Sequence, residues 1–505
     1  MSIVLRERLV FRAALLFSIA PSLMLAQGAD LAAESHHARE LMAAHRFEEA
    51  IPIYENLLKA VPGNTGLLLN LAMAEQMAGH LARSIPHFEA VLKAQPDNVP
   101  ALMSLSMVRL EMNQPGEALA PLKKLVALDA TDRDALGMLA EAEMSTNRLQ
   151  DAAARYRQLT AIDNQDPRAW YGLGKAYEAL ATHALERLNS SAPESPYVAV
   201  LLAETRLERR QYRSAFFFYR AAEAKSPDLP GIHAGLALVY RGAGHSDWAS
   251  SEEKREASLP APDCTREAAE CEFLGKHFLR AAEAATSNAT PATLFWGIKA
   301  YNQLAAEAFD HLNQLPESIE LHAFKAQTLR DHNRSIDAVN EWRAAAKLAP
   351  NSPKVKRELA SALFDAKDYQ SAIPLLEEEL RREPRAPDLN YMLGASLWHV
   401  EQAEKALPYL ESSLRAGTPL TPADGVIGLV LVSLNRNTEA IPHLERALSL
   451  DDDGSLHYSL ARAYQAAGKT ELAAKTIEEY QQIQKQNQKI NGQLDKEAEI
   501  TAPLP

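Results

Sequence analysis

Four short segments, HRFEEA (residues 45–50), GHLARS (79–84), NQPGEA (113–118) and NRLQDA (147–152), decide the fold of this chain. Each segment ends in a small residue, and these residues, Ala50, Ser84, Ala118 and Ala152, are 34 positions apart. Polar and turn-forming residues precede each of them, which is typical of a loop that leads into a helix. The sequence therefore contains a unit that repeats in phase at this spacing.

Two further columns of residues accompany each of these small residues. Four positions later stands a large side chain, in turn Tyr54, Phe88, Leu122 and Tyr156. Twelve positions earlier stands a second small residue, in turn Ala38, Ala72, Ser106 and Ala140. Residues four apart share one face of a helix. The columns predict paired helices that approach closely at the small residues, with the large residue filling the space between pairs.

This pattern resembles the tetratricopeptide repeat, a helix–turn–helix unit of about 34 residues. The resemblance implies an all-α fold, in which stacked repeats form a right-handed superhelix, or α-solenoid. About eleven units fit the alignment, and they begin at Leu31, Thr65, Val99, Arg133, Pro196, Pro230, Ile319, Pro353, Pro387, Thr421 and near Gly454.

Departures from the period divide the chain into segments. We expect a signal peptide over 1–28, four repeats over 31–166, an elongated helix with two repeats over 167–258, an irregular segment with a cysteine pair and a second elongated helix over 259–318, and further repeats over 319–484. The polar tail over 485–505 is expected to begin as a fraying helix and to end as a loose segment. The two elongated helices are near-copies: Lys175 and Tyr177 of one match Lys299 and Tyr301 of the other, 124 positions later. They are either a specialised partner surface or a duplicated module that kept its shape.

Composition supports one long helical protein. The chain has 505 residues, of which 47% are hydrophobic and only 7% aromatic, so it can bury a large core. With a formal charge of −13, the chain lacks the excess of positive charge that typically attracts nucleic acid or an anionic membrane surface.

The segment 1–28 has the features of a secretory signal peptide. Arg6, Arg8 and Arg12 form a basic start, residues 13–26 form an apolar stretch, and small residues precede the expected cleavage after Gly28. We expect export to a bacterial periplasm or beyond. Retention of the uncleaved segment as an anchor is the alternative.

The two cysteines, Cys264 and Cys271, lie in the segment that interrupts the period. A disulfide suits their spacing and an oxidising compartment. Two free thiols, or a metal or redox site with His277, are the alternatives, although two thiols and one imidazole make a poor zinc shell.

Catalytic and cofactor motifs are absent from the sequence, so we expect no enzyme activity and no cofactor. His36 and His37 are adjacent on a helix and point about 100° apart, which does not suit a shared metal ion. The acidic run Asp451–Asp453 lacks the further ligands of a calcium loop, and we expect it to cap the next helix.

The resemblance implies that function resides in a concave groove lined by the second, fifth, ninth, twelfth and thirteenth residues of each unit. In the first four repeats these include six methionines: Met42, Met73, Met77, Met103, Met107 and Met144. Methionine offers flexible apolar surface that adapts to varied peptides. The alternative is that these side chains pack between neighbouring first helices.

The same positions near the C-terminus carry a basic and aromatic set: Lys354, Arg357, Phe364, Tyr391, Trp398 and His399. They predict either a second binding surface, for peptide or polysaccharide, or scattered solvated side chains.

The sequence predicts an exported, non-catalytic scaffold that binds protein or peptide segments in the groove of its repeats. The alternative function is an accessory subunit of cell-envelope polysaccharide export or of outer-membrane assembly.

Overall fold

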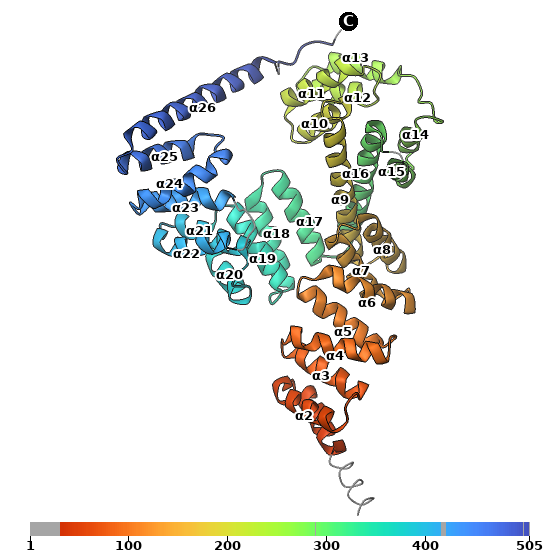
Figure 1. Ribbon diagram of the computed structural model, residues 1–505. Helices are drawn as coiled ribbons and strands as arrows, with labels where there is room; N and C mark the ends of the chain where they lie inside the picture. The colour runs from red at the N-terminus through yellow and green to blue at the C-terminus, as the bar shows by residue number, and fades with distance from the viewer. Residues whose placement is uncertain (1–30, 288, 416–420, 498, 504–505) are drawn as a thin grey trace, which may run out of the picture. The chain divides into compact units, whose positions relative to one another are not determined.

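The computed structural model describes residues 31–287, 289–415, 421–497 and 499–503, and all regular structure in these ranges is helical. Figure 1 shows the helices as successive hairpins. The chain divides into two compact units, residues 1–180 and 181–505. The expected signal peptide, residues 1–28, lies outside the described residues.

The first unit is built of helical hairpins at the predicted spacing. Its helices are 31–43, α2 (Phe47–Ala60), α3 (Thr65–Met77), α4 (Leu81–Ala94), α5 (Val99–Glu111), α6 (Pro115–Leu128), α7 (Arg133–Ser145), α8 (Leu149–Ile162) and the start of α9 (Pro167–Ser191). The first helices α3, α5 and α7 begin at the predicted starts of their units, Thr65, Val99 and Arg133. The repeat period is therefore confirmed in this unit.

Side-chain caps fix where these first helices begin. The side-chain oxygens of Asn64, Asn98 and Asp132, which occupy equivalent positions in successive repeats, accept hydrogen bonds from backbone N–H groups in the first turn of α3, α5 and α7 at 3.0–3.1 Å. Such a cap satisfies an N–H that the helix itself leaves without a partner.

A left-handed residue ends each of these first helices. His45, Gly79, Asn113 and Asn147 have φ values of 56°, 84°, 57° and 58° and also recur once in every repeat. Gly and Asn tolerate this conformation, and it turns the chain sharply into the second helix.

The predicted columns form the core of each repeat. All four residues of the first small column, Ala50, Ser84, Ala118 and Ala152, have no exposed surface, and neither do the four residues of the second. In the large column, Tyr54, Phe88 and Leu122 are fully buried and Tyr156 is half-buried. Stacking of successive hairpins thus buries the apolar side chains that a single repeat would leave exposed to water.

The second unit continues with hairpins of the same kind and contains the longer helices. Its elements are α10 (Pro196–Glu208), α11 (Tyr212–Lys225), α12 (Ile232–Gly242), α13 (Ser246–Ala257), α14 (Ala268–Leu274), α15 (Phe278–Ser287), α16 (Pro291–Gln314), α17 (Ile319–Asp331), α18 (Ser335–Leu348), α19 (Pro353–Asp365), α20 (Tyr369–Arg382), α21 (Pro387–His399), α22 (Ala403–Leu414), α23 (Thr421–Ser433), α24 (Asn437–Ala447), η1 (Leu448–Leu450), α25 (Ser455–Ala466) and α26 (Thr470–Glu497).

The elongated helices are present as predicted, with 25 residues in α9 and 24 in α16. Their matching lysines have different partners. Lys175 pairs with Glu178 of its own helix at 2.6 Å, whereas Lys299 pairs with Glu204 of α10 at 2.6 Å. The two copies share their length but not this contact.

The segment expected to be irregular is so only over residues 259–267. Helix resumes at Ala268, and α14 and α15 form a short hairpin that packs on α16. Ala269, Ala281 and Ala285 are buried, and they follow one another at the spacings of the repeat columns. A shortened repeat therefore occupies this part of the chain.

Cys264 and Cys271 form a disulfide that joins the irregular stretch to α14. Closing so short a loop stabilises the folded chain by about 2–3 kcal/mol, because it restricts the unfolded state. We expect peptide mapping of the oxidised protein to yield Cys264 and Cys271 in one linked product that reduction separates. Alkylation of both thiols without prior reduction would contradict the bridge.

The C-terminal segment contains the helix that the sequence predicts after residue 484, but the residues beyond this helix lie on α12 and are not loose. Helix α26 continues to Glu497, and the extended residues 499–503 return to α12, where the Tyr240 hydroxyl donates a hydrogen bond to the carbonyl oxygen of Thr501. The acidic run Asp451–Asp453 caps α25 as expected, since Asp451 accepts from the backbone N–H groups of Leu456 and His457 at 2.9 and 2.7 Å.

Candidate protein-binding surfaces

The six candidate methionines of the first unit differ in exposure. Met77 at the end of α3 is 58% exposed and Met107 in α5 is 40% exposed. Met42, Met73 and Met103 are half-buried and pack against the core clusters between hairpins. Met144 is also half-buried.

Two of the six side chains therefore present apolar surface to solvent, while three contribute to packing between repeats. The interpretation that methionines fill space between first helices accounts for Met42, Met73 and Met103. It does not account for Met77 and Met107, which the core leaves uncovered.

In the C-terminal repeats, the basic candidates have different surroundings. Lys354 is exposed on α19. The Arg357 guanidinium donates hydrogen bonds to Glu383 at 3.0 Å and to Asp388 at 2.7 Å, and so it ties α19 to the next repeat. Its charge is already balanced within the protein.

The aromatic candidates of these repeats gather into one cluster of five rings. Phe364 of α19 lies 6.1 Å from Tyr391 of α21 between ring centroids, and 5.7 Å from Tyr369 at the start of α20. Tyr369 stacks on His399 at 4.3 Å, and His399 lies 4.8 Å from Trp398. The structure therefore brings Phe364, Tyr391, Trp398 and His399 together and adds Tyr369, which is on a second helix and outside the positions considered from the sequence.

Electrostatics keep this aromatic cluster uncharged near neutral pH. Burial, with a smaller contribution from Lys367, lowers the pKa of His399 below its ordinary value. Burial also raises the pKa of Tyr391. Both side chains are therefore neutral at pH 7, and the cluster is an apolar surface that can stack on a ligand.

A groove of about 720 Å³ lies between α20 and α22, with α21 forming its floor. Most of its lining comes from the second helices α20 and α22, and its first-helix residues, Asn390 and Leu397 of α21, are not among the groove positions considered from the sequence. Its lining is mixed in charge and includes Gln370, Ile373, Glu377, Asn390, Lys405, Tyr409 and Arg415. Sequence reasoning missed this groove because it considered only first helices.

Contacts between a histidine and a carboxylate recur between the two helices of one repeat, and they are buried at His233 and partly buried at the other two sites. His233 Nδ1 lies 2.6 Å from Glu252, His322 Nδ1 lies 2.7 Å from Glu341, and His443 Nδ1 lies 2.7 Å from Asp424. The two partners are 19 positions apart in every case. A histidine and a carboxylate 19 positions apart, on the two helices of one predicted repeat, would identify these pairs from the sequence.

Two carboxylates on first helices, Asp424 of α23 and Glu143 of α7, show how the surroundings of a carboxyl group shift its pKa in opposite directions. Burial opposes ionisation of Asp424, but hydrogen bonds from Arg446 and His443 outweigh it and lower the pKa of this carboxyl. Burial raises the pKa of Glu143, because both of its carboxylate oxygens lack hydrogen-bond partners and Arg155 Nε is 3.9 Å away.

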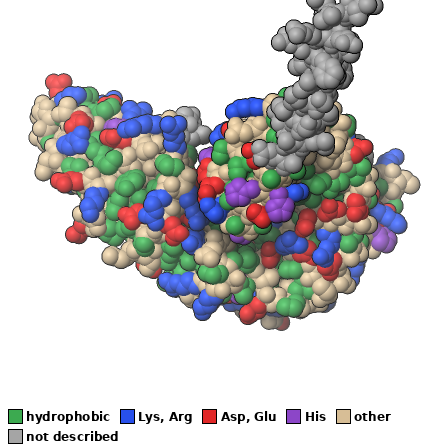
Figure 2. Space-filling model, turned by 90° about the horizontal axis from the view of Figure 1, so that it is seen from below, with side chains coloured by type: hydrophobic (Ala, Val, Ile, Leu, Met, Phe, Trp, Pro, Cys, Tyr) green, Lys and Arg blue, Asp and Glu red, His purple; other side chains and the backbone are tan. Residues whose placement is uncertain are grey.

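Figure 2 shows one face of the molecule, on which acidic, basic and apolar side chains are interspersed. Within the described ranges, no group of three or more His, Cys, Asp or Glu side chains is placed to hold a metal ion. No described helix is long and apolar enough to cross a membrane. His36 and His37 each pair with Glu40, at 3.3 and 3.7 Å.

Comparison with known proteins identifies the repeats. One family model described as tetratricopeptide repeat matches residues 41–106 and 109–176, and a second with the same description matches 325–379, 357–420 and 426–487. No curated protein matches the sequence.

Among solved structures, MamA (residues 41 to the end) from Desulfovibrio magneticus RS-1 is 21% identical, with 34% of this chain and 97% of that chain aligned and a TM-score of 0.31. YrrB, described as a TPR protein with an unusual peptide-binding site, is 17% identical, with 41% and 88% aligned and a TM-score of 0.27.

Proposed function

The chain belongs to the tetratricopeptide-repeat family, and we therefore propose that it is a non-catalytic scaffold that binds segments of other proteins on the first-helix faces of its repeats. The observation that carries the proposal is the exposure of Met77 and Met107 on the successive first helices α3 and α5. Both side chains are long, flexible and apolar, and such side chains supply adaptable contact area for a peptide. The family gives the mode of binding, in which extended or helical segments lie across stacked repeats.

The five-ring cluster of the C-terminal repeats supports a second contact area of the same protein. Four of its rings are half-buried and His399 is exposed. Partly buried aromatic rings provide large contact area and keep a fixed geometry, which is typical of the energetic centre of a binding surface. We propose that this cluster, together with exposed Lys354, binds an apolar or aromatic part of the partner.

We also propose that the protein works outside the cytoplasm, in the bacterial envelope. The sequence of residues 1–28 supports export, and the disulfide between Cys264 and Cys271 is of a kind that persists in oxidising compartments. A scaffold there would meet envelope proteins as its partners.

The experiment is a crosslinking pull-down from the native cell envelope with the mature protein as bait. The double variant Met77→Lys/Met107→Lys is expected to recover about tenfold less partner than the wild type, because each lysine places a charge where apolar contact is needed. The matched control is Ile336→Lys, since Ile336 is 73% exposed but lies on the second helix α18. Circular dichroism should show the same melting curve for all three proteins.

Equal recovery by the wild type and the double variant would remove the methionines from the binding surface. Components of polysaccharide export or outer-membrane assembly among the captured proteins would favour the accessory-subunit function. Loss of recovery with Ile336→Lys alone would place the partner on the second helices instead.

A further inference from the structure

Tyr240 of α12 is enclosed by aromatic side chains. Its side chain has no exposed ring surface, and the ring packs between Phe216 of α11 at 5.8 Å and Trp248 of α13 at 5.6 Å. Both contacts are between ring centroids. The three rings therefore fix the direction in which the Tyr240 hydroxyl points.

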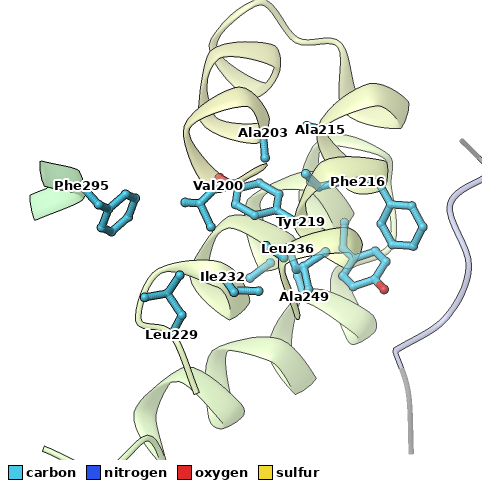
Figure 3. Packing of buried hydrophobic residues seen from close by; sticks show 14 of the residues in the cluster. Val200, Ala203, Ala215, Phe216, Tyr219, Leu229, Ile232, Leu236, Ala249 and Phe295 are labelled. Atoms are coloured by element: carbon cyan, nitrogen blue, oxygen red, sulfur yellow. The ribbon is translucent and has the colours of Figure 1, made fainter. Parts of the chain in front are cut away.

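The partner of this hydroxyl is the C-terminal segment Glu499–Pro503. The Tyr240 hydroxyl donates to the carbonyl oxygen of Thr501 at 2.9 Å. Ile500, the residue before, is partly buried and packs against the cluster that contains Phe216 and Tyr240. Figure 3 shows the pale trace of this segment passing beside the labelled Phe216.

This contact is not a by-product of chain connectivity. Tyr240 and Thr501 are 261 positions apart, so closeness in sequence does not explain the contact. A buried tyrosine hydroxyl also needs a hydrogen-bond partner, because a buried donor without one has lost its hydrogen bonds to water and gained none in return. Burial raises the pKa of Tyr240 to about 12, so the hydroxyl keeps its proton and remains a donor.

The sequence of the segment suits an extended ligand. Ile500 is followed by Thr501, Ala502 and Pro503, and the segment has no regular secondary structure. Proline fixes its own backbone angle and disfavours helix at the residue before it. Pro503 thus restricts its own backbone and that of Ala502, which reduces the freedom that this end of the segment loses when it docks.

We propose that residues Glu499–Pro503 are a peptide ligand of their own chain and that Phe216, Tyr240 and Trp248 form its docking site. Recognition rests on one branched aliphatic side chain placed on an aromatic cluster and on one backbone carbonyl that accepts from Tyr240. This site is distinct from the methionines of the first unit and from the five-ring cluster, so it adds a third surface to the protein. Another protein segment of the same chemistry has to displace the tail to bind here.

The first experiment locates the tail in the full-length protein. Ala502 is replaced by the photo-reactive residue benzoylphenylalanine, a mixture of ¹⁴N- and ¹⁵N-labelled chains is irradiated, and the products are mapped by mass spectrometry. The expected product joins residue 502 to a peptide that contains Phe216, Tyr240 or Trp248, within a single chain. Adding Ile500→Asp should lower the yield about tenfold or more, because it places a charge on the aromatic cluster. Thr501→Val is the matched control and should leave the yield unchanged, since only the backbone of Thr501 makes the contact.

The second experiment measures the docking site directly. A fluorescein-labelled peptide of residues 494–505 should bind the full-length Ile500→Asp chain about tenfold more tightly than the wild type, whose site is already occupied. Adding Tyr240→Phe should weaken peptide binding about fivefold, as expected for loss of one hydrogen bond.

Three results would overturn the proposal. The first is a crosslink between two chains of different isotope label, which would assign the site to the tail of a second copy. The second is a crosslink yield that the Ile500→Asp substitution leaves unchanged. The third is equal affinity of the labelled peptide for the wild type and for the Ile500→Asp variant. None of these results depends on the partner captured from the envelope.

Discussion

Replacing Tyr219 with alanine is expected to lower the free energy of unfolding of the hairpins around α11 and α12 by about 3–5 kcal/mol, the range for removing a large buried side chain. Tyr219 is 1% exposed and belongs to the column of large residues that fills the space between repeats. Figure 3 shows its ring among Val200, Ala203, Ala215 and Leu236.

The size of this effect follows from how closely the ring fits the next helix. A Cβ atom at Gly235 of α12 would overlap the Tyr219 ring, so the ring lies directly on the backbone of that helix. The neighbouring backbone cannot move far enough to fill the space of a missing ring, and a cavity remains. Gly172 lies against Tyr156 in the same way, and the glycine follows the tyrosine at the same spacing in both pairs.

Hydrogen exchange is the appropriate measurement, because a long repeat array does not unfold as one two-state system. Amides of α11 and α12 should exchange faster in the Tyr219→Ala variant, while those of α3 to α7 should not change. Tyr458→Ala is the matched control, since Tyr458 is 47% exposed on α25 and its removal leaves no cavity. If the amides of α11 and α12 stayed equally protected from exchange, the large side chains of this column would not stabilise the stacking of repeats.

The repeat columns were predictable because helix geometry and packing obey the same spacing. Ala38 and Ala50 are both buried, and Ala72 and Ser84 repeat their spacing in the next unit. The position of a residue within the repeat determines both which of the two helices it belongs to and whether its side chain is buried. The 34-residue period is therefore enough to predict both properties. The same spacing in Ala269, Ala281 and Ala285 was overlooked, because α14 is a short helix that follows a stretch rich in proline.

The binding surfaces were less predictable, since they depend on contacts between repeats. Met73 and Met77 are one helical turn apart on α3, yet one packs into a core cluster and the other is 58% exposed. Periodicity assigns both to the first-helix face but does not show which one the next hairpin covers. The contact between Tyr240 and Thr501 lies further beyond sequence reasoning, because no periodic pattern connects residues 261 positions apart.

Replacing His233 with leucine is expected to destabilise the α12–α13 hairpin by about 3 kcal/mol, because it leaves a buried carboxylate without its partner. Glu252 has no exposed surface, and its Oε2 atom lies 2.6 Å from His233 Nδ1. The other oxygen, Oε1, has no hydrogen-bond partner, and Arg255 is 3.6 Å from it. Arg255 offsets part of the loss, which sets the expected value at the lower end of the range for broken buried pairs.

The double variant His233→Leu/Glu252→Leu separates the pair from the individual side chains. Two apolar residues of similar volume need no hydrogen bonds, so the double variant is expected to recover most of the lost stability, and a double-mutant cycle measures the coupling. His36→Leu is the matched control, because His36 and its partner Glu40 are 67% and 62% exposed and such surface pairs contribute about 0–1 kcal/mol. Protection of α12 and α13 amides from hydrogen exchange reports both effects. A double variant as unstable as His233→Leu alone would show that the histidine acts through its shape rather than through Glu252, and the pairs at His322 and His443 would then need the same reinterpretation.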